Sequence, residues 1–336
     1  MSAPEGVRLA WVDTARGLGI VLVVLGHALI GLFDASLLPR SGWPWRLYYA
    51  VYAFHMPLFF WLAGLFAPRS LDRPAPALLT QWWWRLVWPY LLWSTLQWAV
   101  LGLSAGWANH AAELSLARWL ALSWRPISQF WFLQTLLLLQ VLAWWGRPRL
   151  GTTGLLWAAL TLLLLPSLLP MPVGVTNVCR FGIFFVLGLV QAGEAPGADP
   201  ALSAARAGPA ATWLAVALLA GLVTVVSGEV MARGDLPWQP AALPAACAGV
   251  LGSVLLAQQA PPAAQALLAR LGRASMPIFL LHIFFVAGTR IALQRLTDWS
   301  WAALLGLAVV AGLLGPLAVQ AMARRLGGSR AWGLGT

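Results

Sequence analysis

Apolar segments long enough to cross a lipid bilayer recur along almost the whole of this chain. Of its 336 residues, 60% are hydrophobic and only 9% are charged. A membrane-spanning helix needs about 20 apolar residues, because the hydrocarbon core of a bilayer is about 30 Å thick. We therefore expect an all-α, polytopic membrane bundle of about ten transmembrane helices. This composition excludes soluble enzymes and, despite a formal net charge of +11, nucleic-acid-binding folds.

The expected spans follow one another with short connections. They cover residues 11–33, 46–67, 81–103, 129–145, 151–169, 178–193, 209–227, 243–259, 275–293 and 301–321. The stretch 193–209 is rich in Ala, Gly and Pro, so we interpret it as a linker between helices 1–6 and 7–10 of a single integral-membrane domain covering 1–336. The longest loop, 104–128, has room for a short interfacial helix.

The basic residues indicate how the bundle is oriented. All 21 of them are arginines, and more of them fall in the loops on the side of the N-terminus. Cytoplasmic loops of membrane proteins carry such an excess, so we expect both termini in the cytoplasm and a multi-pass protein of the cell inner (cytoplasmic) membrane. The loop arginines would meet anionic membrane lipids, and the 22 tryptophans suit interfacial belts. We expect no nucleic-acid partner.

Charged and ionisable side chains inside a spanning helix are costly, so each is a functional candidate. The first span contains Asp13, Arg16 and His27. At about 100° per residue, eleven steps bring His27 to within roughly 20° of the direction of Arg16, and about 16 Å away along the axis. This spacing suits a long substrate that a cation holds at one end while an imidazole acts at the other. Histidine is the usual general base near neutral pH.

A structural role explains the same residues equally well. Asp13 and Arg16 would then form an interfacial salt bridge, and His27 would bond to a carbonyl in the bundle. The glycines of this helix, Gly17, Gly19 and Gly26, would let a partner helix or a ligand approach closely.

Four motifs, in order, resemble the membrane acyltransferase-3 family, and in particular its subgroup that is similar to fucose 4-O-acetylase. They are Arg16 and His27 within VDTARGLGIVLVVLGH, YAFHMPLFFWLAGLF at 52–66, FWFLQTLLLLQ at 130–140, and LGRASMPIFLLH at 271–282. The resemblance covers nearly the whole chain and agrees with the ten-helix expectation.

This resemblance implies an acyl-CoA-dependent O-acyltransferase, usually an acetyltransferase, that modifies a carbohydrate hydroxyl. The donor would be acetyl-coenzyme A as a co-substrate, with no metal, and the acceptor a lipid-linked or exported cell-envelope glycan such as an exopolysaccharide. His27 would be the base, while Arg16 would orient the donor and Asp13 would neutralise Arg16. The phosphates of coenzyme A would dock at the first cytoplasmic loop, on Arg69, Arg73 and Arg85, unless these arginines serve only topology.

Four further residues are candidates for substrate binding. His55 precedes Pro57 and therefore a helix kink or start, and irregular backbone in a membrane usually lines a cavity. Trp131 and Gln134 are placed to stack on or bond a sugar or the adenine, although the aromatic ring can equally be core. His282 matches the fourth motif but is also suited to a structural role. Arg180 opens the sixth expected span, where we expect it to serve as a membrane-boundary anchor.

The sequence leaves the route and two rival functions open. Cys179 and Ser275 lack an evident base partner, so direct attack by the acceptor is favoured over an acyl-enzyme. The two cysteines, Cys179 and Cys247, have no metal-ligand spacing. A proton-coupled transporter of a glycan precursor or other small molecule should show internal repeats, and we find no second copy of the VDTARG or FHMP motif. A non-catalytic scaffold should tolerate substitution of His27.

Overall fold

The fold is all-helical over the residues that the computed structural model describes, which are 10–104, 106, 109, 112–194, 209–296 and 298–334. The helices are α1 (Ala10–Asp34), α2 (Gly42–Phe66), α3 (Pro68–Leu71), α4 (Ala75–Trp82), a π-helical turn (Trp83–Val87), α5 (Trp88–Leu103), α6 (Leu116–Ala121), α7 (Trp131–Leu168), α8 (Val173–Glu194), α10 (Pro209–Ala232), α11 (Leu243–Gln259), α12 (Pro262–Arg273), α13 (Ser275–Leu296) and α14 (Trp301–Arg325). Short 3-10 helices at Ser128–Phe130 and Pro240–Ala242 precede α7 and α11.

Nine helices within the described residues are long and apolar enough to span a membrane. They confirm the expected polytopic bundle, and the difference from ten lies in α7. This helix has 38 residues, which is too long for one crossing at 1.5 Å per residue. At Gly151 its backbone leaves the helical region with φ +65°, and the limbs on either side correspond to the expected spans 129–145 and 151–169.

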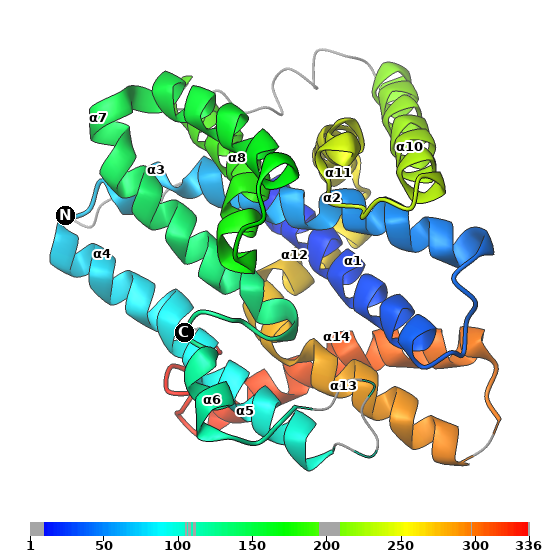
Figure 1. Cartoon of the computed structure of the whole chain (residues 1–336). Coiled ribbons are helices and arrows are strands. Elements are labelled where there is room, and N and C mark those ends of the chain that lie inside the picture. The colour runs from blue at the N-terminus through cyan, green and yellow to red at the C-terminus, as the bar shows by residue number, and fades with distance from the viewer. Residues whose placement is uncertain are drawn as a thin grey trace.

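Helix α1 lies in the middle of the bundle and contacts α2, α11, α12, α13 and α14 (Figure 1). Three of its glycines, Gly17, Gly19 and Gly26, allow the close approaches expected of them. A Cβ at Gly19 would fall 2.9 Å from the Phe59 ring, and one at Gly26 would fall 2.7 Å from the Tyr52 ring, so α2 packs directly on the α1 backbone. The helix that carries Asp13, Arg16 and His27 is therefore enclosed by others on most sides.

The sequence analysis did not predict α12, which packs against the first turns of α1. A Cβ at Gly17 would overlap the backbone carbonyl of Leu268, and one at Gly272 would overlap the carbonyl oxygen of Asp13. Because 17 lies opposite 268 and 13 opposite 272, the two helices run antiparallel here. The chain then turns at Ala274 into α13, which returns along α1.

Two connecting segments lie partly outside the described residues. The loop 104–128 contains the expected short helix, α6, but residues 105, 107, 108, 110 and 111 are not described. The linker 193–209 falls between the end of α8 and the start of α10, and residues 195–208 lie outside the described part. Its role as a division between two groups of helices stays a prediction.

The α1–α12 contact predicts which glycine the fold cannot lose. Gly272→Ala should lower the stability of the protein in detergent by about 1–3 kcal/mol or more, because the methyl group must push two backbones apart. Thermal unfolding of the purified protein measures this change. The matched control is Gly306→Ala in α14, where a Cβ meets nothing within 4 Å and stability should change by about 1 kcal/mol or less. Equal midpoints for the two variants would contradict the close packing.

Candidate functional site

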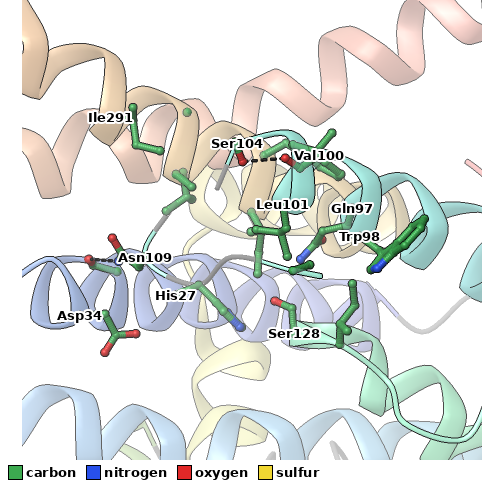
Figure 2. A pocket seen from close by; sticks show the side chains of 18 of the residues that line it. His27, Asp34, Gln97, Trp98, Val100, Leu101, Ser104, Asn109, Ser128 and Ile291 are labelled. Carbon is green, nitrogen blue, oxygen red and sulfur yellow. Dashed lines mark hydrogen bonds between the residues drawn. The ribbon is translucent and has the colours of Figure 1, made fainter. Parts of the chain in front are cut away.

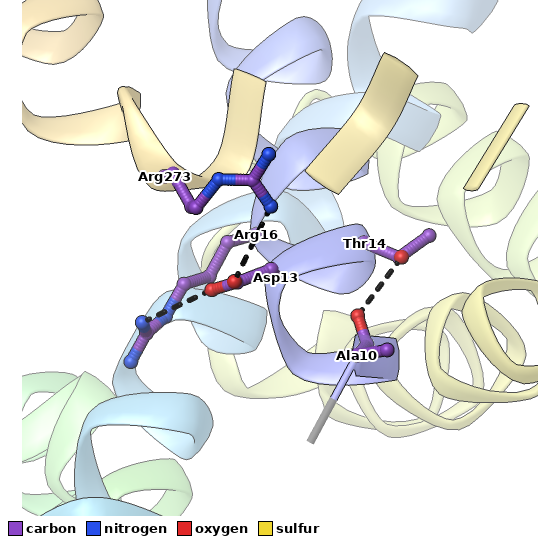
Figure 3. A network of polar contacts seen from close by, with 5 residues as sticks. All are labelled: Ala10, Asp13, Thr14, Arg16 and Arg273. Atoms are coloured by element: carbon purple, nitrogen blue, oxygen red, sulfur yellow. Dashed lines mark hydrogen bonds and ion pairs between the residues drawn. The ribbon is translucent and has the colours of Figure 1, made fainter. Parts of the chain in front are cut away.

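One end of α1 carries a cluster of cations around a single buried carboxylate (Figure 3). The Asp13 carboxylate lies 3.9 Å from a guanidinium nitrogen of Arg16 and 3.8 Å from one of Arg273, which ends α12. The Asp13 side chain is only 7% exposed, whereas those of Arg16 and Arg273 are 36% and 45% exposed. The predicted Asp13–Arg16 pair is present, and Arg273 joins it from a helix that sequence analysis missed.

Arg69 extends this cluster through an aromatic ring. The Phe66 ring lies 5.4 Å from the Arg16 guanidinium carbon and 5.1 Å from that of Arg69, so it separates two cations that would otherwise repel. We call Arg16, Arg69 and Arg273 the arginine cluster. Arg73 and Arg85 are exposed, and Arg85 lies in the π-helical turn that joins α4 and α5. Their role in donor binding stays a prediction.

His27 lies eleven residues along α1 from Arg16, and the unbroken helix supports the separation of about 16 Å inferred from the sequence. Its Nδ1 is 2.9 Å from the carbonyl oxygen of Val23. A carbonyl oxygen only accepts hydrogen bonds, so Nδ1 carries the proton and Nε2 is left as the basic nitrogen. The ring thus has the tautomer that a general base needs, and its orientation is fixed by its own helix.

Two more histidines surround His27. The ring of His282 from α13 lies edge-on at 4.9 Å between centroids. The Tyr52 ring of α2 lies 6.2 Å from the His27 ring and 4.8 Å from the His55 ring, measured between centroids. It is therefore a neighbour of both histidines. The Nδ1 atoms of His55 and His282 also bond to backbone carbonyls, of Val51 at 2.7 Å and Phe279 at 2.8 Å. The sequence-predicted residues His27, His55 and His282 therefore lie together.

His55 and His282 are far less accessible than His27. They are 1% and 0% exposed, and Nε2 of His282 is buried with no hydrogen-bond partner in the described part of the chain. His55 lies inside α2, which begins at Gly42, so FHMP is not a helix start and Pro57 sits in the helix interior. No group of three or more His, Cys, Asp or Glu among the described residues is arranged to hold a metal.

A cavity of about 750 Å³ opens beside His27, between α1, α5, α13 and the 104–128 segment (Figure 2). The His27 ring points from α1 towards Ser128, while Asp34 and Asn109 lie farther along α1. Asn109 donates to the carbonyl of Gly31 at 3.0 Å and accepts from the buried Arg290 at 2.9 Å. The cavity therefore combines apolar helix faces with a polar region away from the arginine cluster.

A second cavity of about 430 Å³ lies on the other side of His27, against α2 and α8. Both cavities are lined by His27 and Ser128, so the imidazole stands where they meet. His55 and Trp131 line the second cavity, and their contact with a substrate stays a prediction. Gln134 and His282 line neither; Gln134 instead donates to the carbonyl of Ser123 at 3.2 Å. Their substrate contacts stay a prediction.

Arg180 does not open its helix, contrary to the expectation from the sequence. Helix α8 begins at Val173 and not at 178, so Arg180 is about two turns inside it. Its side chain lines the smaller cavity. The depth of a residue follows from where its helix starts, and the polar residues before Val178 concealed the first turns of α8.

Two other site residues were missed for different reasons. Ser128 has φ +47° and lies two residues before the FWFLQ motif, but a serine in a loop gives no signal that it will meet a histidine 101 positions away. Arg273 was counted only as a loop cation. The Gly272 beside it, within LGR, was the available signal for close helix packing.

Comparison with known proteins identifies the family. A family model described as an acyltransferase domain, that of the acyltransferase-3 family, matches residues 9–320. The same comparisons match no curated protein and no solved structure. The match covers both ends of the site, from Asp13 to His282.

The burial of the three histidines predicts their order of chemical reactivity. Diethylpyrocarbonate modifies neutral imidazoles, so in the folded protein it should label His27 before His55 or His282, because only His27 is partly exposed between the two cavities. Peptide mass spectrometry after brief exposure in detergent measures this order. Labelling of His282 as fast as His27 would contradict the geometry, and unfolded protein provides the control in which all sites react.

Proposed function

The chain belongs to the acyltransferase-3 family, and from that premise we propose that it moves an acetyl or other short acyl group from acetyl-coenzyme A to a carbohydrate hydroxyl. The observation that carries this proposal is the position of His27. It stands between two cavities with Nε2 as its basic nitrogen, on the same helix as the arginine cluster. A base at a cavity junction suits a reaction that brings two substrates together.

The arginine cluster is the proposed site for the phosphates of the donor. Arg16 and Arg273 pair with the Asp13 carboxylate, and Arg69 lies against the same Phe66 ring as Arg16, so the described residues of the cluster are three cations and one anion. Arginine is suited to phosphate because its planar donors form paired, charge-assisted hydrogen bonds. From this end, the long pantetheine arm of coenzyme A would follow α1 towards His27, a rise of about 16 Å.

The proposed step is direct transfer. Nε2 of His27 takes the proton of the acceptor hydroxyl as its oxygen attacks the thioester carbonyl carbon. The tetrahedral intermediate then collapses, the carbon–sulfur bond breaks, and the coenzyme A thiolate receives the proton from the imidazolium. The products are an O-acyl ester and free coenzyme A. Cys179 is buried and lines neither cavity, which supports direct transfer over an acyl-cysteine route.

Ser128 is the proposed stabiliser of the oxyanion. Its residue lines both cavities beside His27 and begins the 3-10 helix that leads into α7. The first N–H groups of a helix have no partner within the helix and lie at its positive end. Together with the Ser128 hydroxyl, they are suited to an oxygen that becomes negatively charged in the transition state.

The larger cavity is the proposed acceptor site. Its wall includes carboxylate, amide and guanidinium groups that suit sugar hydroxyls, from Asp34, Asn109, Glu113 and Arg118, and the indole of Trp98 on which a sugar ring can stack. The cavity lies at the end of α1 opposite the arginine cluster. With the arginine-rich end in the cytoplasm, the acceptor would be a lipid-linked or exported glycan, and the protein would act in the inner membrane.

Separate loss of donor binding and of turnover tests the proposal. In purified protein, His27→Ala should reduce acetyl-coenzyme A hydrolysis or transfer by about 10²- to 10⁴-fold, because it removes the base, while coenzyme A still binds. Arg16→Ala should weaken coenzyme A binding, measured by equilibrium titration. Folded wild-type protein that binds no coenzyme A would contradict the proposal and favour a transporter.

The Ser128→Ala variant tests the oxyanion assignment. Its turnover should fall by about 10- to 1,000-fold with donor binding unchanged, because one donor to the oxyanion is lost and the backbone donors remain. Ser104→Ala, in the wall of the larger cavity, is the control, since its hydroxyl already donates to the carbonyl of Val100. Unchanged turnover in Ser128→Ala would remove Ser128 from the mechanism.

A further inference from the structure

Arg180 is a cation inside a membrane-spanning helix for which the described residues provide no counter-ion. Its Nε is buried and has no hydrogen-bond partner there, and none of the ion pairs among the described residues includes it. Among the described residues that line the smaller cavity with Arg180, none is Asp or Glu. The cavity therefore has a positive charge on its wall and no negative one.

Two other arginines in or beside spanning helices have polar partners. The buried Arg290 of α13 donates to Asn109 and to Gln294, each at 2.9 Å. Arg233 at the end of α10 is exposed and lies 4.0 Å from Glu229. A charge within the bilayer costs about 2.5–3.5 kcal/mol even by insertion scales, and such groups pair or line a pathway for a ligand. The lack of a partner at Arg180 therefore indicates a ligand that supplies the negative charge.

The surroundings of Arg180 have the form of a small-molecule site. Asn177 lies three residues earlier on the same helix face and lines the same cavity, which adds an amide beside the guanidinium. Trp131 and Trp238 contribute aromatic walls, and His27 forms the far side. A volume of about 430 Å³ is within the range of pockets that enclose a small ligand.

We infer that Arg180 and Asn177 form a binding site for an oxyanion, a phosphate or a carboxylate, that the acceptor carries. The donor phosphates already have the arginine cluster at the other end of α1, whereas the Arg180 cavity shares the wall residues His27 and Ser128 with the larger cavity, the proposed acceptor site. An acceptor in the larger cavity would present a hydroxyl to His27, while its anionic group extends past His27 and pairs with Arg180. Assignment to the acceptor rests on the proposed function, but binding of an anion does not.

Binding of sugar probes without any acyl donor tests this inference. Full-length protein in detergent is titrated with glucose 1-phosphate, glucuronate and neutral glucose, and binding is followed by thermal shift and calorimetry. The variants are Arg180→Gln, Arg180→Lys and Asn177→Asp, with Arg233→Gln as the charge-matched control at an exposed site. Asn177→Asp keeps Arg180 but places a carboxylate one turn away, as an internal competitor for the anion.

We expect the wild type and Arg233→Gln to bind at least one anionic probe about tenfold or more tightly than glucose, the scale of a charge-assisted hydrogen bond. Arg180→Gln and Asn177→Asp should lose this preference, and Arg180→Lys should retain part of it. A preference for glucose 1-phosphate identifies a phosphate, and one for glucuronate identifies an acidic sugar.

Two results would overturn the inference. One is equal binding of glucose and both anionic probes by the wild type. The other is a preference for an anionic probe over glucose that persists in Asn177→Asp. This result would overturn the inference even if Arg180→Gln does not fold. Because these titrations contain no acyl donor, their result tests anion binding at Arg180 independently of the catalytic role proposed for His27.

Discussion

The backbone contact between α1 and α12 is the constraint on which the geometry of the site depends. Gly17 and Gly272 let the two helices touch without side chains between them, and this contact brings Arg273 to Asp13. The same helix α1 then carries His27 about 16 Å away, since its hydrogen bonds are unbroken between the two positions. The cation cluster and the imidazole are thus held at a fixed separation by one rigid element. A substrate that needs both must be long enough to connect them.

The second constraint is that polar groups within the bundle must find partners there. The histidines meet it locally at one ring nitrogen, because each Nδ1 donates to a carbonyl in the preceding helical turn, whereas Nε2 of His282 is buried without a partner among the described residues. This arrangement fixes the tautomer and leaves Nε2 directed away from the helix backbone. Arg290 meets the constraint through Asn109 and Gln294. Arg180 differs, because its buried Nε has no partner among the described residues, and its cavity is lined by the same imidazole of His27.

The sequence was sufficient for the elements that depend on local periodicity. The apolar spans, the shared face of Arg16 and His27, and the small-residue contacts of Gly17, Gly19 and Gly26 all follow from the helix repeat. It also separated the two limbs of α7, because Gly and Pro residues surround the break at Gly151. It was insufficient for α12 and for the depth of Arg180, because helix ends depend on packing. The cavities were also unpredictable, since Ser128 and His27 meet only through the tertiary fold.

The central claim is that donor and acceptor reach His27 from opposite ends of α1. The most direct test is the structure of the protein with coenzyme A bound. The account predicts the phosphates of coenzyme A in contact with Arg16, Arg69 and Arg273, and its thiol directed along α1 towards His27. Phosphates seated against Arg180, or coenzyme A bound wholly outside the helical bundle, would contradict it.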